Sequence, residues 1–120
     1  MLIISQNLLH YDVKFKANTV LRVNLAWTML KELKKTIRCH SKKTIFLDLP
    51  INRIKPPNNS YSIDDLITIL RNYTNIKYLA ISNVEKKEDV LKYKKIIPNH
   101  VMIVPKIESV KGIMNIKEIT

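Results

Sequence analysis

Short runs of aliphatic and β-branched residues recur along this chain of 120 residues, and they restrict it to a sheet-forming fold. Each run has the length of a strand and is apolar on both faces, which is typical of strands buried in a parallel sheet. Segments with helical periodicity separate most of them. This order predicts a parallel α/β architecture of about five strands. The expected strands are 2–5, 19–25, 43–49, 76–82 and 101–107.

The helical segments are expected at 27–40, 62–73 and 85–97, with a further helical pattern after the only glycine, Gly112. Ser62 is a suitable N-cap for the second of them, because aspartates follow in its first turn. The prolines and asparagines of 50–61 predict a loop. We expect a single domain over residues 1–120, since the length suits one core.

The net charge of +11 raises the question of nucleic-acid binding. The excess is almost entirely lysine and is scattered along the expected helices, so solvated helix faces explain it better, and nucleic acid is not the expected partner. Cys39 is the only cysteine, which fits a reducing compartment. No signal peptide or membrane-spanning run is recognisable, and a cytoplasmic location is expected. We interpret the histidines, His10, His40 and His100, as surface or loop residues.

Polar residues gather where the expected strands end. In parallel α/β folds these carboxyl ends carry the functional groups. Carboxylates are suited to a hard divalent cation, and arginine and lysine to a phosphate or carboxylate. Such a set is equipped for phosphoryl transfer or for stabilising an enolate. The residues concerned are Arg22, Asn24, Asp48, Ser82, Lys106 and Glu108.

A structural explanation competes with this one. Lys106 and Glu108 stand two residues apart, so both point to the same side of an extended strand and could simply neutralise each other. An isolated Asp48 could cap a turn, and Arg22 could belong to an ion pair. From these residue types alone, a salt-bridged strand end remains open beside a reaction site.

Four segments resemble the barrel domain of pyruvate kinase, a member of the phosphoenolpyruvate/pyruvate-binding TIM barrels. "PKIESVKGIMNIKEI" is similar to the family's K-I-E-N-x-x-G-x-x-N-x-x-E-I segment, with Ser109 as the departure. "LAISNVEKKEDV" resembles A-x-S-F-V-x-x-x-x-D-V, with Asn83 at the aromatic position. "LRVNLAW" resembles R-x-N-F-S-H, and "IFLDLPINRIK" resembles L-D-x-x-G-P-x-I-R. They follow the family's order across residues 19–119.

The resemblance implies a partial or reduced (β/α) TIM-barrel-like sheet and a role for each matching position. Lys106 would be the catalytic lysine and Glu108 a ligand of the divalent cation, Mg²⁺. Arg22 and Ser82 would face the substrate phosphate. The monovalent-cation site, for K⁺, would include Asn24 and Asp48.

Several positions depart from the family. Ala26 stands at a potassium-ligating serine, Trp27 at a histidine that contacts nucleotide, and Lys55 at an arginine. The segment "PPNNSYSI" occupies the place of the capping domain, and Thr120 precedes the strand that would carry the second metal ligand. An arc of five strands would leave edges and apolar surface open. We therefore expect a homo-oligomer, or a partner subunit that completes the barrel.

The resulting hypothesis is a pyruvate kinase-like protein that keeps part of a phosphoenolpyruvate/pyruvate and divalent-metal site. Phosphoryl transfer by the chain alone is not expected. Two alternatives are a non-catalytic interaction or regulatory module derived from a degenerate barrel, and a lyase or aldolase relative that uses metal-enolate chemistry.

Overall fold

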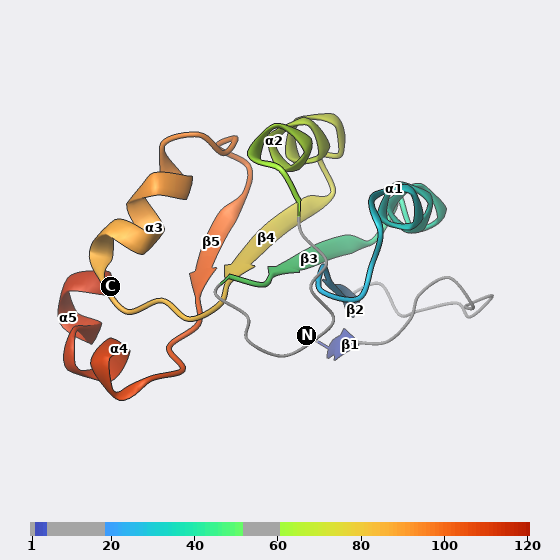
Figure 1. Ribbon diagram of the computed structural model, residues 1–120. Coiled ribbons are helices and arrows are strands. Elements are labelled where there is room, and N and C mark those ends of the chain that lie inside the picture. The colour runs from blue at the N-terminus through green and yellow to red at the C-terminus, as the bar shows by residue number, and fades with distance from the viewer. Residues whose placement is uncertain (1, 5–18, 52–60) are drawn as a thin grey trace.

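A parallel five-stranded sheet organises the computed structural model, which describes residues 2–4, 19–51 and 61–120 (Figure 1). The strands pair in the order of the chain, and every pair is parallel. The predicted α/β class, with about five parallel strands, is confirmed. The strands are β1 (Leu2–Ile4), β2 (Thr19–Asn24), β3 (Thr44–Leu49), β4 (Ile76–Ile81) and β5 (Met102–Pro105).

Helices follow four of the strands. Ser62 caps α2 as expected, and its hydroxyl accepts a hydrogen bond from the Asp65 N–H at 3.1 Å. The pattern after Gly112 forms two short helices rather than one. The helices are α1 (Leu30–Cys39), α2 (Ile63–Asn72), α3 (Lys87–Lys94), α4 (Val110–Met114) and α5 (Ile116–Ile119).

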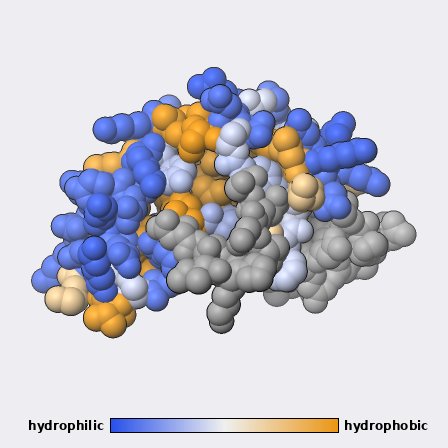
Figure 2. Space-filling view, viewed as in Figure 1, coloured by the Kyte–Doolittle hydropathy of each residue, from blue (hydrophilic) through white to orange (hydrophobic). Residues whose placement is uncertain are grey.

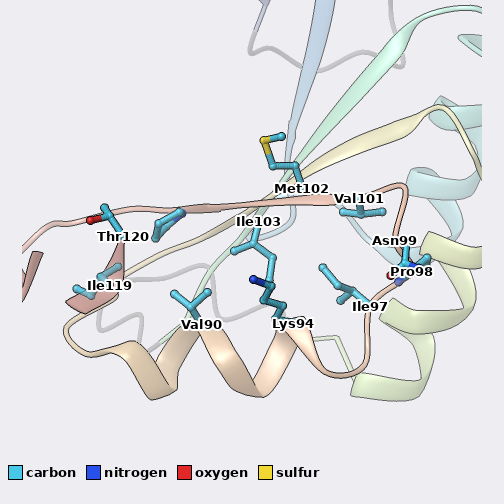
Figure 3. Close-up of a pocket in the computed structure, with 11 residues that line it drawn as sticks. Val90, Lys94, Ile97, Pro98, Asn99, Val101, Met102, Ile103, Ile119 and Thr120 are labelled. Carbon is cyan, nitrogen blue, oxygen red and sulfur yellow. The ribbon is translucent and has the colours of Figure 1, made fainter. Parts of the chain in front are cut away.

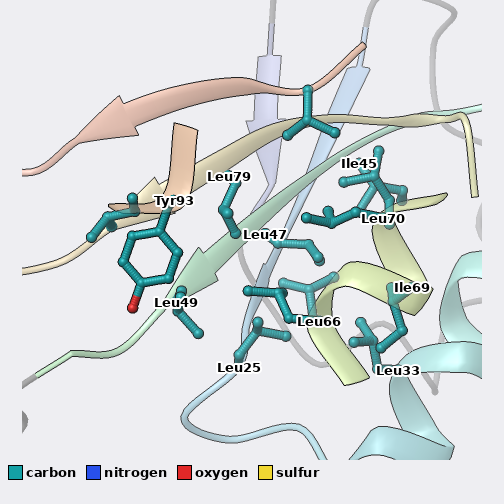
Figure 4. Close-up of a cluster of buried hydrophobic side chains, with 14 of the residues drawn as sticks. Leu25, Leu33, Ile45, Leu47, Leu49, Leu66, Ile69, Leu70, Leu79 and Tyr93 are labelled. Atoms are coloured by element: carbon teal, nitrogen blue, oxygen red, sulfur yellow. The ribbon is translucent and has the colours of Figure 1, made fainter. Parts of the chain in front are cut away.

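The core lies between one face of the sheet and the helices (Figure 4). Alternate strand residues such as Leu47 and Leu79 point to this face, where Leu33 of α1 and Leu66 of α2 meet them. All four are at most 1% exposed. Burial of such aliphatic side chains stabilises the sheet by about 1.5–3 kcal/mol for each.

The opposite face carries a different set of side chains. In the strand register one row contains Arg22, Phe46, Tyr78 and Met102. The ring centroids of Phe46 and Tyr78 are 5.8 Å apart. Met102, on the last strand, is 63% exposed. The next row toward the carboxyl ends contains Asp48, so this face, and not the helix-covered one, leads to the candidate site.

The only glycine allows α4 to approach the chain that follows β4. A β-carbon at Gly112 would lie 2.6 Å from the Val84 carbonyl oxygen, closer than such atoms pack. The Asn115 amide donates to the Glu85 carbonyl at 2.9 Å and fixes the same contact. Ser109 caps α4 by accepting from the Gly112 N–H. Much of the "ESVKGIMN" segment therefore positions α4 and α5.

Figure 2 shows a small group of hydrophobic side chains at the end occupied by α4, apart from the larger hydrophobic areas in the middle and upper part of the view. Four exposed apolar residues belong to the two short helices, Val110, Ile113, Met114 and Ile116. We call this set the α4–α5 apolar patch. Across the described residues, every helix is too short or too polar to cross a bilayer.

Some expectations fall outside the described residues, namely those on His10, Lys55 and most of the 50–61 loop. His40 and His100 lie in turns, as expected, and both are half-buried.

Candidate anion site at the carboxyl end of the sheet

The register of the sheet brings the predicted polar residues to one edge. Asn24 of β2 lies opposite Asp48 of β3, and Asp48 lies opposite Ala80 of β4. Lys106 follows β5 directly, and its N–H continues the ladder by donating to the Ile81 carbonyl at 2.9 Å. Residues from four parallel strands therefore converge, because the strands all end at the same edge.

Asp48 is the centre of the cluster. It is 3% exposed, although it lies at a strand end. Its carboxylate accepts a hydrogen bond from the Arg22 guanidinium. It also accepts from the Lys106 ammonium, at 3.2 Å to Oδ1 and 3.1 Å to Oδ2. A buried carboxylate with two cationic partners is satisfied, because each ion offsets the desolvation of the other.

Lys106 reaches Asp48 across an intervening strand. The register places Ala80 of β4 between Asp48 and Val104 of β5. A side chain at Ala80 longer than a methyl would occupy the path of the lysine, since Ala80 itself is fully buried. The small residue is therefore a condition for the ion pair.

The orientation of the Glu108 side chain has a different cause from the strand alternation that the sequence suggested. Strand β5 ends at Pro105, so strand alternation does not orient Lys106 and Glu108. Instead, the Asn83 N–H donates to Glu108 Oε2 at 2.7 Å, while Oε1 lies 3.6 Å from the Lys106 ammonium. The two side chains do approach each other, but through a contact with the β4–α3 connection.

Asn83 takes a left-handed backbone conformation, with φ of 52°. Asparagine tolerates this region better than most residues. Its side-chain amide donates to the Ile51 carbonyl at 2.7 Å. One residue thus connects the end of β3 to Glu108 and acts as a polar positioning group.

Ser82 is occupied by the main chain. Its hydroxyl accepts from the Ile51 N–H at 2.6 Å and lies 3.2 Å from the Ile51 carbonyl. It therefore fixes the chain after β3 against the end of β4. In this arrangement Ser82 shapes the site, and a direct contact with a ligand would compete with the bonds to Ile51.

Asn24 and the residues after it form a turn at the rim. The Asn24 side-chain oxygen accepts from the Ala26 N–H at 2.9 Å. Ala26 is fully buried, whereas the neighbouring Trp27 is 68% exposed. Trp27 thus lies on the surface, beside the strand that carries Arg22.

The converging side chains line a small open pocket of about 130 Å³. Its size suits an anion of a few atoms and is well below the usual range for drug-sized ligands. Three ionised side chains line it, Asp48, Lys106 and Glu108, and Arg22 pairs with Asp48 from outside the lining, so the formal charges of the four linked groups cancel. The lining residues are Asn24, Asp48, Pro50, Ser82, Asn83, Lys106 and Glu108.

This charge balance decides which ions the site can hold. Glu108 is 41% exposed at its side chain and is the carboxylate best placed to meet a divalent cation. Mg²⁺ often takes only one or two protein carboxylates and fills its shell with water and substrate oxygens, so Glu108 fits that role. No group of three metal-ligating acidic, histidine or cysteine side chains occurs among the described residues.

The predicted K⁺ site fits less well. The Asp48 carboxylate already forms ion pairs with two cationic side chains, and the Asn24 side-chain oxygen already accepts a backbone N–H. A potassium ion there would have to compete with Arg22 and Lys106 for the same carboxylate.

The sequence suggested six candidate residues, and the structure brings them to one end of the sheet, with four of them linked by ion pairs. The sequence did not indicate that Ala80, Asn83 or the Ile51 main chain would shape the site. The signal for Asn83 was available, since asparagine after a strand is typical of a left-handed turn. Ala80 and Ile51 act through register, which a single sequence does not reveal.

Comparison with known proteins adds no identification. No protein family model matches the chain, and no curated protein matches it in sequence. The resemblance to the pyruvate kinase barrel therefore stays a prediction.

Proposed function

We propose that the chain binds a small anion of the phosphoenolpyruvate or pyruvate type, together with Mg²⁺, at the carboxyl end of its sheet. In this proposal it is a pyruvate kinase-like protein with part of the substrate site retained. The observation that carries the proposal is the convergence of Arg22, Asp48, Lys106 and Glu108 from four separate segments. Its setting would be the cytoplasm, where such metabolites and a free Cys39 thiol are compatible.

The role of each group follows from its chemistry. Lys106 lines the pocket and would contact the oxygens of the anion through its charged donor, whereas Arg22 lies outside the lining and would add positive charge through its ion pair with Asp48. Glu108 would hold the cation, which offsets the charge that a dianion brings to a neutral site. Asp48 would keep the two cations in place.

Phosphoryl transfer to ADP by this chain alone is not part of the proposal. Trp27 replaces the nucleotide-contacting histidine of the family, and it lies exposed instead of in the site. A partner subunit or a second copy would have to supply nucleotide contacts.

A second candidate is a non-catalytic interaction module. What favours it is the complete mutual pairing of the ionised side chains in the site, since a set of ion pairs can serve stability alone. A metal-enolate lyase or aldolase relative would use the same carboxylate and lysine, and no further observation favours it.

Titration calorimetry with oxalate tests the proposal, because oxalate is a small dianion of the right shape. We expect binding that strengthens at least tenfold when Mg²⁺ is present, since the metal reverses an unfavourable charge balance. Glu108→Gln should remove the Mg²⁺ dependence, and Lys106→Met should weaken oxalate in both conditions.

Glu118→Gln is the matched control, because Glu118 is an exposed carboxylate on α5 away from the pocket. It should bind oxalate as the unmodified chain does. Absence of oxalate binding both with and without Mg²⁺ would favour the interaction module instead.

A further inference from the structure

A groove unrelated to the candidate anion site runs along the outer edge of β5 (Figure 3). Its volume is about 440 Å³, within the usual range of small-molecule pockets. Aliphatic side chains from α3, the α3–β5 connection, β5 and α5 form its walls. The lining includes Val90, Ile97, Val101, Ile103, Ile119 and Lys94.

The sheet edge in this groove offers a single backbone donor in its middle. The Lys106 N–H donates to the Ile81 carbonyl, and the Lys106 carbonyl accepts from the Val84 N–H. Both main-chain groups of Lys106 therefore point toward β4. Neighbouring residues of a parallel strand alternate in direction, so Ile103 and Pro105 face outward. Pro105 has no N–H, and the Val101 N–H is bonded to the Pro98 carbonyl. The Ile103 N–H is therefore the donor that the groove presents.

One cation accompanies that donor. Lys94 rises from α3 toward β5 and ends beside Ile103 in the close-up view (Figure 3). It is the only ionisable side chain in the lining, and its ammonium has no ion-pair partner among the described residues. An unpaired ammonium above an apolar floor is complementary to a carboxylate that ends an apolar chain.

We propose that this groove binds a medium-chain fatty acid. The acyl chain lies against Ile97, Ile103 and Ile119, and the carboxylate meets the Lys94 ammonium and the Ile103 N–H. A second copy of the protein is a poorer occupant of the same edge. Its strand would face Pro105, which has no N–H to donate to a pairing strand.

The test uses sodium decanoate, below the concentration at which it forms micelles, and the ¹⁵N-labelled chain. We expect saturable shifts of the Ile103 amide and of residues lining the groove. Lys94→Met should weaken decanoate about fivefold, as for a partly exposed charge pair. Decanol should bind the unmodified chain about fivefold more weakly than decanoate, and it should bind Lys94→Met equally well.

Two controls separate this site from others. Lys95→Met removes a neighbouring exposed charge that does not line the groove, and it should leave decanoate binding unchanged. Lys106→Met should also leave decanoate binding unchanged. A negative result with decanoate would therefore not count against the proposed oxalate site. The proposal is overturned by an unperturbed Ile103 amide, by equal binding of decanol and decanoate to the unmodified chain, or by a Lys94→Met variant that binds decanoate normally.

Discussion

Asp48 is almost completely buried, and two cations contact its carboxylate. This arrangement determines how much stability the protein loses when Asp48 is replaced and how the net charge of the site changes. Replacing such a residue leaves Arg22 and Lys106 close together with nothing between them to compensate. Both cations are about a third exposed, so water moderates the penalty.

Asp48→Asn should therefore lower the free energy of unfolding by about 2 kcal/mol. The same substitution leaves the site with one net positive charge, so oxalate should bind more tightly in the absence of Mg²⁺. Urea unfolding and calorimetry measure the two effects. Unchanged stability would show that the ion pairs contribute little, and weaker oxalate binding would show that Asp48 orients the cations more than it neutralises them.

Tyr93 on α3 is a residue whose pKa is changed by its surroundings. Burial raises the pKa of the Tyr93 hydroxyl above its ordinary 10.0, and the nearby Asp89 carboxylate raises it further. The folded state therefore holds this proton more tightly than the unfolded state. The corresponding stabilisation is complete below the unfolded pKa and is lost as pH rises through the folded one.

Unfolding of the unmodified chain should consequently become easier between about pH 9 and pH 11. In Tyr93→Phe the decline should be shallower, because the hydroxyl whose pKa is raised in the folded state is then absent. Urea unfolding at several pH values gives both slopes. Parallel slopes for the two proteins would contradict a buried, proton-retaining Tyr93.

At the scale of elements, α4 and α5 illustrate how a motif can serve packing. Gly112 and Asn115 belong to the same short segment as Glu108, yet they contact the Val84 and Glu85 carbonyls and not the pocket. The neighbouring Glu108, by contrast, depends on Asn83 for its orientation. One short segment therefore contains residues for docking and residues for the site.

Gly112→Ala tests this docking. The added methyl would meet the Val84 carbonyl oxygen at 2.6 Å, and backbone cannot move aside as a side chain can. We expect a loss of about 1–3 kcal/mol of unfolding free energy, as for other overpacked sites. Lys117→Ala is the control, because Lys117 is exposed on α5 outside the apolar patch and its loss should cost under about 0.5 kcal/mol. Equal stability of Gly112→Ala and the unmodified chain would mean that α4 shifts freely.

The elements themselves followed from periodicity. Runs of two-sided apolar residues predicted all five strands, because a buried parallel strand has no polar face. The convergence of Arg22, Asp48 and Lys106 was also predictable, since parallel strands end at one edge. The reach of Lys106 over Ala80 was not, because it depends on register. The orientation of Glu108 was expected for the wrong reason, since β5 ends at Pro105.

At the scale of the whole molecule, an open sheet and a high charge act in opposite directions. Both outer strands, β1 and β5, pair on one side only within the described sheet. The α4–α5 apolar patch exposes between 45% and 79% of each of its four side chains. Burial of such a patch favours self-association, whereas the net charge of +11 on each copy opposes it.

Self-association through the α4–α5 apolar patch should therefore increase with ionic strength. Salt shortens the screening length to about 8 Å at physiological strength and about 3 Å at 1 M, which removes the repulsion but leaves apolar burial intact. Light scattering at micromolar concentration should show a dimer that strengthens from low to high salt. Met114→Glu should return the chain to a 14.0 kDa monomer, because a charge would then be buried at the contact. Glu118→Gln should leave the dimer unaffected, since Glu118 is a polar neighbour outside the patch. A monomer at every salt concentration, or a dimer that salt dissociates, would contradict an apolar contact and point to a surface held together by charge.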